Sequence, residues 1–414
     1  MKTNISFSQA IEILQNESIA PVGKEKIFFG DALGRTLASG VCARNHMPRF
    51  ETSSMDGYAI NAADIDYLQT QGLHLVGVNP AGEEKEFALI PQSAIKTFTG
   101  SRMPQNSDTI VIVESIVQKD GKIFLAPHAP RPKKGDWVRH IGENYHQGEV
   151  LLKASSKIGA YEIGLLADLN QVFVEVYRKP KIAILSGGAE VVEVGEEAKG
   201  VNCVRSVNNH LLKALVHTMG GEALLYPIMP DDKDAITAML TQALKDCDML
   251  LVSGGMSMGD YDFTQVSLAQ LCEIVFKGVR LKPGKPVTYA IYHHHDQKKP
   301  VFGLPGYPNS SALTFYLFGS VIFAKLFGRK YSHHFLKAFL GADVYRSDTR
   351  MEFRVCDLEI REGRYWVHFS SKHIFQSSVI NNLCGDCALM VLEENGTDLK
   401  KGSEVDILLF KHLN

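Results

Sequence analysis

Residues 249–262 read Met249-Leu250-Leu251-Val252-Ser253-Gly254-Gly255-Met256-Ser257-Met258-Gly259-Asp260-Tyr261-Asp262. The apolar start of this stretch predicts a strand that is buried on both faces, as in a parallel sheet. Glycine and serine at the end of such a strand leave backbone N–H groups free to converge on an anion. Asp260 and Asp262 follow at once, where two carboxylates could hold a divalent cation against that anion.

Strands and helices alternate around this stretch. The pattern predicts a doubly wound α/β domain with a mostly parallel sheet. Ligands of such sheets bind at the carboxyl ends of the strands, which is where Ser186-Gly187-Gly188 and Ser253-Gly254-Gly255 fall. The expected strands are 182–185, 223–227 and 249–252, and the expected helices that follow them are 207–218, 232–246 and 262–271.

Paired lysines and prolines come next along the chain. The segments are Lys282-Pro283-Gly284-Lys285-Pro286 and Gly303-Leu304-Pro305-Gly306-Tyr307-Pro308. Prolines and glycines around the lysines indicate a stiff cationic loop rather than a solvated run of charge. Each segment alone is a weak signal, but their order and spacing predict a site for phosphate or another oxyanion.

The chain has 414 residues, which exceeds what one hydrophobic core usually organises, so several domains are expected. Short alternating segments rich in Gly, Pro and Asn predict an inserted β-rich domain at 46–145. Alternating runs on both sides of Arg361-Glu362-Gly363 predict a hairpin in a small C-terminal β domain at 329–414. The remaining assignments are an α/β domain at 1–26 and 178–328 and a linking domain at 27–45 and 146–177.

Bulk composition excludes several classes of function. The formal net charge is −2, so no general attraction to nucleic acid or to an anionic membrane is expected. No apolar run approaches the roughly 18–20 residues that a membrane-spanning helix needs. Seven cysteines without a disulfide framework are typical of a reducing compartment, so a cytoplasmic location is expected.

Several motifs also have simpler interpretations. Asp56-Gly57 and Thr99-Gly100 are typical of surface turns, and Glu190 could cap a helix. Adjacent histidines at 293–295 point in different directions and favour an exposed loop over a metal site. The Cys384 to Cys387 pair has no second CxxC and favours a turn between strands. Motifs of the commonest serine hydrolases, nucleoside triphosphatases and zinc proteases are missing.

Ordered motifs along nearly the whole chain resemble the molybdopterin molybdenumtransferase family, which includes the MoeA proteins and the E domain of gephyrin. The most specific are Ser54-Met55-Asp56-Gly57-Tyr58-Ala59 and the segment from Ser253 to Asp260. The others are Gly30 to Ala38, Thr99-Gly100, Asp231-Asp232, Lys282 to Pro286 and Leu304-Pro305-Gly306.

The resemblance implies an elongated subunit of four domains that forms a homodimer. It implies that molybdate is inserted into adenylylated molybdopterin with release of AMP, in the presence of a divalent cation such as Mg²⁺. Molybdopterin adenylyltransferase and molybdoenzymes are the protein partners that it suggests. Molybdate and tungstate are too similar in size and charge for the sequence to distinguish them.

The resemblance also assigns site residues. Asp56 and Thr99 would act from the partner subunit's side of the cleft, and Ser371 is preferred over Ser370 as a molybdate-binding serine. The residues expected to handle the cation and the adenylate are Glu190, Asp231, Asp232 and Asp262, with Glu190 and Asp262 as metal ligands. The residues expected to bind substrate are Asn208, Gly254, Gly255, Ser257, Lys282, Lys285, Pro305, Pro308, Arg350 and Ser371.

These residue types suit the implied chemistry, because lysine, arginine, serine and backbone N–H groups bind tetrahedral oxyanions. Carboxylates beside a dianion would repel it unless a cation lies between them. The chain departs from the family pattern at Gly187, Ala189, Asn144 and Tyr307. These departures leave a second hypothesis open, a molybdopterin-binding paralogue or scaffold with weak or no turnover.

Overall fold

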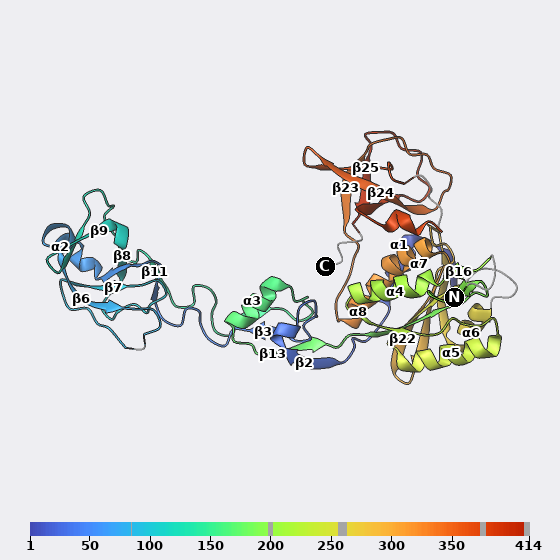
Figure 1. Cartoon of the computed structure of the whole chain (residues 1–414), viewed down its shortest axis with the longest axis horizontal. Helices are drawn as coiled ribbons and strands as arrows, with labels where there is room; N and C mark the ends of the chain where they lie inside the picture. The colour runs from blue at the N-terminus through green and yellow to red at the C-terminus, as the bar shows by residue number, and fades with distance from the viewer. Residues whose placement is uncertain (84, 198–201, 256–262, 373–377, 410–414) are drawn as a thin grey trace. The chain divides into compact units, whose positions relative to one another are not determined.

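The computed structural model describes residues 1–83, 85–197, 202–255, 263–372 and 378–409. It divides into two compact units (Figure 1). The core unit comprises Met1–Ser39, Ser155–Ala167 and Gln171–Asn414, and the inserted unit comprises Gly40–Ala154 and Asp168–Asn170. The predicted β-rich segment 46–145 lies within the inserted unit. The finer division into four domains stays a prediction.

A seven-stranded sheet forms the centre of the core unit. The four strands from β22 through β18 and β14 to the edge strand β17 pair in parallel, whereas β21 pairs antiparallel with both of its neighbours. The antiparallel part arises because β21 and β22 are joined by a two-residue turn and not by a crossover helix. Across the sheet the strands are β1 (Lys2–Ile5), β19 (Glu273–Val279), β21 (Thr288–His294), β22 (Gln297–Leu304), β18 (Met249–Ser253), β14 (Lys181–Ser186) and β17 (Glu222–Leu225).

The three consecutive histidines lie at this hairpin. His293 and His294 are the last residues of β21 and pair with Lys298 and Gln297, and His295 follows in the turn with φ of +51°. The prediction of an exposed loop is therefore wrong for the first two histidines. Cross-strand pairing continues to the turn, so the polar composition of this stretch does not end the strand.

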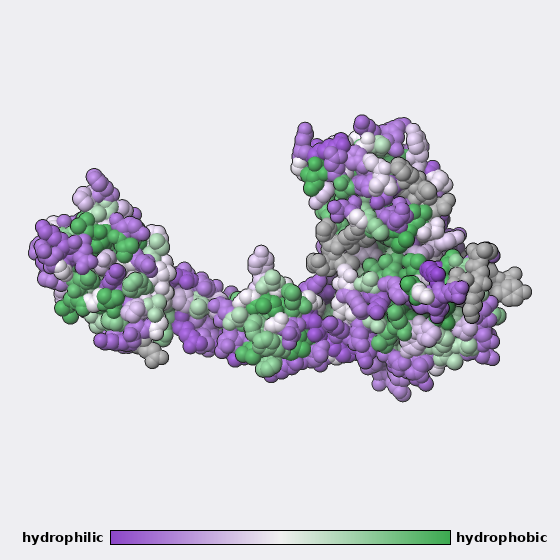
Figure 2. Space-filling view, in the orientation of Figure 1, coloured by the Kyte–Doolittle hydropathy of each residue, from purple (hydrophilic) through white to green (hydrophobic). Residues whose placement is uncertain are grey.

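Helices cover both faces of the sheet (Figure 1). In β18, Leu251 joins the core cluster beneath α1, α4, α7 and α8, whereas Leu250 joins the cluster beneath α5 and α6. Burial on both faces explains why this strand is apolar throughout. The outer side of α5 is hydrophilic (Figure 2). The helices are α1 (Phe7–Asn16), α4 (Val207–Thr218), α5 (Lys233–Asp246), α6 (Phe263–Leu271), α7 (Pro308–Thr314), the π-helical η4 (Phe315–Gly319) and α8 (Ser320–Leu326). The doubly wound α/β prediction is confirmed.

A small β-barrel forms the C-terminal part of the core unit, as predicted. β24, β25, β23, β27 and β26 close on themselves, and β20 attaches to β24. The predicted hairpin is β24–β25, whose turn residues Glu362 and Gly363 have φ of +50° and +73°, as a type I′ turn requires. The strands are β20 (Leu281–Lys282), β23 (Phe335–Leu340), β24 (Met351–Arg361), β25 (Arg364–His368), β26 (Cys387–Leu392) and β27 (Glu404–Leu408).

The chain passes from the α/β sheet to the barrel through one residue. β19 ends at Val279 and β20 begins at Leu281. Arg280 between them donates its N–H to the carbonyl of Ile5 at 2.8 Å and accepts from the N–H of Met351 at 3.2 Å. The start of the lysine loop, residues 282–286, is therefore held between the two sheets.

The inserted unit is built on a six-stranded sheet with one face packed against α2 (Ile65–Thr70). Leu68 of this helix is buried with Tyr58, Ile60 and Val111 of the strands. The order is β8 (Thr109–Ile112), β5 (Gly57–Ile60), β7 (Ser93–Thr97), β6 (Leu73–Asn79), β10 (Lys122–Leu125) and β9 (Ile116–Lys119). Two short ladders pair β3 (Val41–Cys42) with β12 (Val150–Leu152) and β4 (Thr52–Ser53) with β11 (Val138–Arg139).

Smaller elements complete the description. β2 (Lys24–Phe28) pairs with β13 (Phe173–Tyr177), β15 (Val191–Val192) pairs with β16 (Val204–Arg205), and α3 spans Ala160–Asp168. Within the described ranges, no helix combines the length and the apolar character needed to cross a bilayer.

Candidate functional site

The carboxyl ends of β14, β18 and β22 meet at one edge of the sheet. Ser186 lies opposite Ser253, and Ser253 lies opposite Leu304. The loops that follow bring glycines together: Gly187 donates its N–H to the carbonyl of Ser253 at 3.0 Å. We call residues 186–190, 253–255 and 305–308 the glycine edge.

Glycine is required at position 254 of this edge. Gly254 has φ of +84°, and a Cβ there would lie 2.2 Å from the carbonyl oxygen of Gly187. A Cβ on Gly306 would lie 3.8 Å from the Gly254 Cα atom. The three loops therefore approach one another at backbone distance, and the lack of side chains on their glycines would let a ligand come close to the backbone.

Buried hydroxyl and amide groups hold this edge together. The Ser186 Oγ donates to the Oδ1 of Asn209 on α4 at 2.5 Å and lies 2.9 Å from the Oγ of Ser253. All three side chains are buried. Sequence analysis missed this support, although a serine at the end of each of two apolar strands was a usable signal.

The predicted substrate residue Asn208 also faces the edge. Its Nδ2 donates to the carbonyl of Gly306 at 2.8 Å, while its Oδ1 is buried and has no hydrogen-bond partner among the described residues. An unpaired buried acceptor costs stability, so a ligand N–H or O–H at this point would be favourable. Pro305 is buried and Pro308 is the first residue of α7. Tyr307, one of the departures from the family pattern, has φ of −70°, so its ring causes no backbone strain.

Three predicted acidic residues belong to this edge or follow a segment that is hydrogen-bonded to it. Glu190 is exposed, and its carboxylate oxygens lie 3.0 Å from where a Cβ on Gly188 would be. Asp232 caps α5, because its Oδ1 accepts from the Ala235 N–H at 2.8 Å. The hydrogen bond from the Met229 N–H to the Ser186 carbonyl, at 2.8 Å, brings the segment that precedes exposed Asp231 to the edge.

The remaining predicted groups of this stretch, Ser257, Asp260 and Asp262, lie outside the described residues. Among the residues that the structure does describe, no group of three or more His, Cys, Asp or Glu side chains could hold a metal ion. Mg²⁺ commonly needs only one or two carboxylates together with substrate phosphate and water. Glu190 beside the glycine turn fits that modest requirement.

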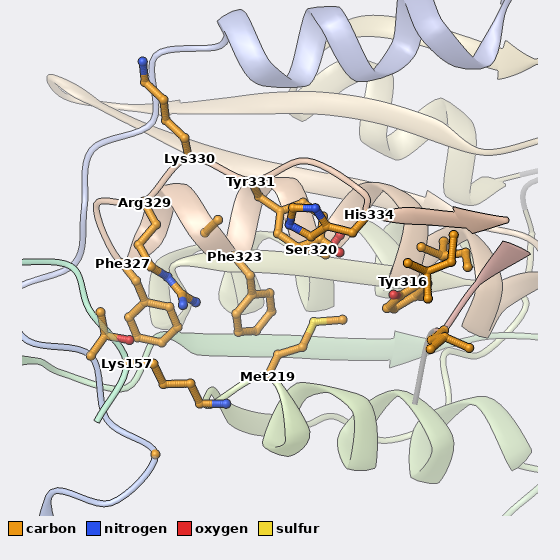
Figure 3. A pocket seen from close by; sticks show the side chains of 16 residues that line it. Lys157, Met219, Tyr316, Ser320, Phe323, Phe327, Arg329, Lys330, Tyr331 and His334 are labelled. Atoms are coloured by element: carbon orange, nitrogen blue, oxygen red, sulfur yellow. The ribbon is translucent and has the colours of Figure 1, made fainter. Parts of the chain in front are cut away.

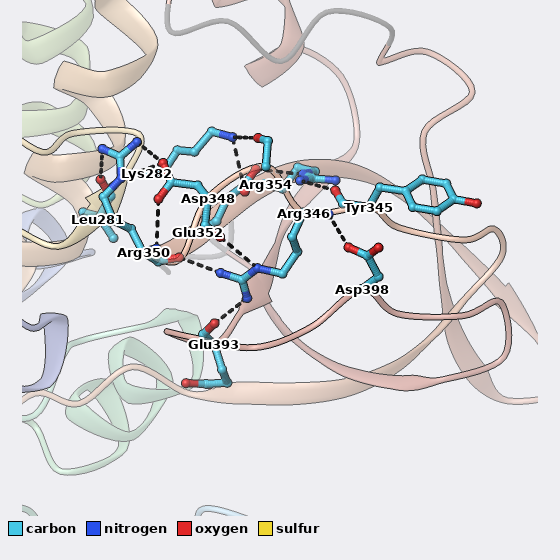
Figure 4. Close-up of polar contacts among 11 residues, drawn as sticks. Leu281, Lys282, Tyr345, Arg346, Asp348, Arg350, Glu352, Arg354, Glu393 and Asp398 are labelled. Carbon is cyan, nitrogen blue, oxygen red and sulfur yellow. Dashed lines mark hydrogen bonds and ion pairs between the residues drawn. The ribbon is translucent and has the colours of Figure 1, made fainter.

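Lysine and arginine side chains meet where β20 pairs with β24 (Figure 4). The Lys282 Nζ lies 3.4 Å from the Ser347 Oγ and 3.4 Å from an Oε2 of Glu352. Glu352 is only 3% exposed, and its other oxygen accepts from the Arg354 Nε at 2.8 Å. We call Lys282, Ser347, Asp348, Arg350 and Glu352 the barrel-edge cluster.

Arg350 is held tightly within this cluster. Its Nε donates to the Asp348 Oδ2 at 2.7 Å, its Nη2 contacts the same oxygen, and its Nη1 donates to the carbonyl of Leu281 at 3.2 Å. The hydrogen bonds from Arg350 hold the pKa of the Asp348 carboxyl well below its usual range. The same hydrogen bonds raise the pKa of Arg350. An oxyanion bound here would compete with the Asp348 carboxylate for the Nε and Nη2 donors of Arg350.

The lysine loop and the glycine edge lie at the two ends of α7. Gly284 has φ of +108°, and a Cβ there would lie 2.1 Å from the Cγ2 of Thr314, the last residue of α7. The helix begins at Pro308 on the glycine edge and spans 7 residues, about 10 Å at 1.5 Å per residue. Lys285 in the loop is exposed. One extended ligand can therefore contact both the glycine edge and the lysine loop, residues 282–286.

The structure does not bring Ser371 to this cluster. The Ser371 Oγ and N–H donate to the carboxylate of Asp357 at 2.6 Å and 2.9 Å. Asp357 lies seven positions beyond Arg350, which is roughly 20 Å along an extended strand. Ser347 lies beside Lys282 instead. The predicted candidates, Ser370 and Ser371, follow Arg350 in the sequence, whereas the serine beside Lys282 in the structure, Ser347, precedes it.

The predicted site residues Asp56 and Thr99 lie in the inserted unit and are hydrogen-bonded to each other. The N–H and the Oγ1 of Thr99 both donate to the Asp56 Oδ1, each at 2.8 Å. The Thr99 N–H, and after it the hydroxyl, lower the pKa of the Asp56 carboxyl. Both residues are exposed. The structure thus combines the turn interpretation with an ordered, ionised carboxylate.

Comparisons with known proteins cover nearly the whole chain. A family described as the MoeA N-terminal region (domain I and II) matches residues 5–169, and one described as a probable molybdopterin binding domain matches residues 183–324. The chain is 33% identical over 384 residues to a molybdopterin molybdenumtransferase of Nostoc sp., covering 91% of this chain and 86% of the relative. It is 28% identical to the enzyme of the same description from Haemophilus influenzae, covering 99% of each.

A comparison with solved structures also finds a MoeA protein that is similar along the whole chain. The molybdopterin biosynthesis MoeA protein from Pyrococcus horikoshii OT3 superposes with a TM-score of 0.81 at 26% identity, covering 98% of this chain and 100% of that one. Overlap along both whole chains means that the similarity includes the inserted unit and the barrel as well as the α/β domain.

Proposed function

Because the chain belongs to the molybdopterin molybdenumtransferase family, which acts in molybdenum cofactor biosynthesis, we propose that it inserts molybdate into adenylylated molybdopterin and releases AMP. The observation that carries the proposal is the spacing of two anion-binding groups along α7. The glycine edge supplies backbone N–H groups at one end of this helix, and the lysine loop supplies cations at the other end.

In this proposal the glycine edge binds the phosphates of the adenylylated pterin, with the unpaired Asn208 Oδ1 accepting from the ligand. Lys282 and Lys285 hold molybdate close to the reacting dithiolene and so replace an encounter in solution by an oriented approach. Arg350 and Ser347 complete the oxyanion contacts. Glu190 and Asp262 would hold Mg²⁺, which when bound neutralises phosphate charge and polarises the anhydride bond that is cleaved.

A single-turnover assay tests the proposed function. The protein is mixed with adenylylated molybdopterin, magnesium and molybdate, and AMP is measured by chromatography. Stoichiometric AMP release that depends on molybdate is expected. If the pterin binds but no AMP appears, the chain is a molybdopterin-binding paralogue without turnover, the alternative motivated by Ala189 and Asn144.

Arg350 and Asp348 should have opposite effects on the molybdate requirement. Arg350→Ala should raise the molybdate concentration for half-maximal AMP release by roughly tenfold, because charge-assisted hydrogen bonds are lost. Asp348→Asn should lower that concentration by roughly threefold, because the guanidinium then has no competing carboxylate. The measurement is a molybdate titration of AMP release. Shifts of both variants in the same direction would mean that the pair acts only as a structural bridge.

We further propose a cytoplasmic homodimer in which Asp56 and Thr99 act on substrate held by the other chain. Support for the location comes from the cysteines, among which the described residues show no disulfide bond, and support for the shared site comes from the ordered Asp56–Thr99 pair. After subunit exchange, a mixture of Asp56→Asn and Lys285→Ala proteins should recover about a quarter of the wild-type rate, because a random mixture is half heterodimer and each heterodimer keeps one intact site. Exchange verified by mass spectrometry without any recovery would place the whole site in one chain.

A further inference from the structure

A cavity of about 510 Å³ lies in the core unit at the far ends of α4 and α8 (Figure 3). Its aromatic side chains include Tyr316, Phe323 and Phe327, and its cations include Lys157 and Arg329. Among the described residues, no aspartate or glutamate lines it. The cavity is therefore both apolar and positively charged, a combination that the proposed reaction does not use.

Arg329 lacks a counter-charge among the described residues. No carboxylate of the described part of the chain raises the pKa of Arg329, and its Nε is buried without a hydrogen-bond partner there. Burial lowers the pKa of Arg329. Burial and then the charge of Arg329 lower the pKa of Lys157. Figure 3 shows both side chains beside the phenylalanine rings, whereas Lys330 extends away from them.

A buried hydroxyl and a ring surface complete the lining. Ser320 is 5% exposed, and its Oγ has no hydrogen-bond partner in the described structure. The Arg329 guanidinium lies 5.6 Å from the centre of the Phe327 ring. A cation, a donor hydroxyl and aromatic faces around one cavity are what an anionic group on an apolar body needs.

The cavity is separate from the glycine edge. Asn209 near the start of α4 supports that edge, whereas Met219 after the end of α4 lines the cavity. Ten residues of helix separate the two, which is about 15 Å. Helices α7, η4 and α8 likewise run from Pro308 on the edge to Phe327 at the cavity. The two sites lie at opposite ends of the same helical layer.

We propose that this cavity binds a small organic anion, a phosphate or carboxylate attached to an aromatic or other apolar body. Arg329 and Lys157 bind the anionic group, Ser320 donates to it, and the rings of Phe323 and Phe327 contact the body. The occupied cavity supplies the negative charge that Arg329 lacks. This inference does not depend on the proposed transferase reaction, because none of these residues belongs to the glycine edge or the barrel-edge cluster.

Isothermal titration of the full chain with phenyl phosphate, benzoate, inorganic phosphate and phenol tests the proposal. Phenyl phosphate or benzoate should bind at least tenfold more tightly than inorganic phosphate or phenol, and the stronger of the two identifies the anionic group. Arg329→Gln should weaken that binding about tenfold, and Ser320→Ala about fivefold. Lys285→Ala, which removes a cation of the proposed molybdate site, should leave it unchanged.

Thermal unfolding without ligand provides an independent readout. Removing a half-buried charge that has no counter-charge among the described residues should leave the melting temperature of Arg329→Gln equal to or above that of the wild type. A lower melting temperature with unchanged phenyl phosphate binding would overturn the proposal. So would absence of binding by every probe together with a changed oligomeric state of Arg329→Gln in light scattering, since a second copy of the chain would then fill the cavity.

Discussion

Replacing Lys282 with methionine should slow molybdate-dependent AMP release by about a hundredfold or more, the usual effect of removing one donor from a reacting oxyanion. The same change should lower the free energy of unfolding by about 1–3 kcal/mol, because it leaves an oxygen of the buried Glu352 without its cation. Activity is measured in single turnovers, and stability by urea unfolding.

The double variant Lys282→Met/Glu352→Gln separates these two effects. Removing both charges should restore most of the lost stability, because no buried carboxylate oxygen then lacks its cation. AMP release should stay slow, because the ammonium group is still missing. If activity returned together with stability, Lys282 would serve only to hold Glu352, and the molybdate site would lie elsewhere.

Replacing Gly254 with alanine should destabilise the α/β domain by about 3 kcal/mol or more. The new Cβ would need a positive φ of +84° and would lie 2.2 Å from the Gly187 carbonyl oxygen, so the ends of β14 and β18 would have to separate. Affinity for adenylylated molybdopterin should fall by at least tenfold, because the same peptide groups are proposed to bind its phosphates. Urea unfolding and equilibrium binding measure the two effects.

Gly195→Ala is the matched control. Gly195 also has a positive φ, +91°, but no atom of the described residues lies within 4 Å of a Cβ at this position. Gly195→Ala should therefore lower the free energy of unfolding by only about 1 kcal/mol, the cost of placing an alanine at a positive φ. Equal losses in the two variants would mean that the close approach of Gly254 to Gly187 does not shape the edge.

The sequence was most informative where local pattern decides structure. The continuous apolar run before Ser253 predicted a strand buried on both faces, and Leu250 and Leu251 indeed pack in opposite clusters. The Glu362-Gly363 turn predicted the β24–β25 hairpin. In these cases neighbouring residues supply both the signal and the geometry, so no distant contact is needed to interpret them.

Contacts between distant segments were not predictable in this way. The Arg350–Asp348 pair is close in sequence, but its position beside Lys282 depends on the pairing of β20 with β24, about 70 residues apart. Ser347 was not considered beside Ser370 and Ser371, because the sequence does not show that register. The hydrogen bond between Ser186 and Asn209 likewise needs α4 to pack over β14. Such contacts follow from tertiary packing, which the spacing of motifs does not encode.

The single residue between β19 and β20 couples the two sheets mechanically. Lys282 moves with the barrel, because it pairs with β24. Lys285 moves with the α/β sheet, because its carbonyl accepts from the Val279 N–H at 3.0 Å. A rotation of the barrel about Arg280 therefore changes the separation of the two ammonium groups. An oxyanion held by both, as proposed, would resist that rotation, and substrate occupancy and barrel orientation would then form one linked equilibrium.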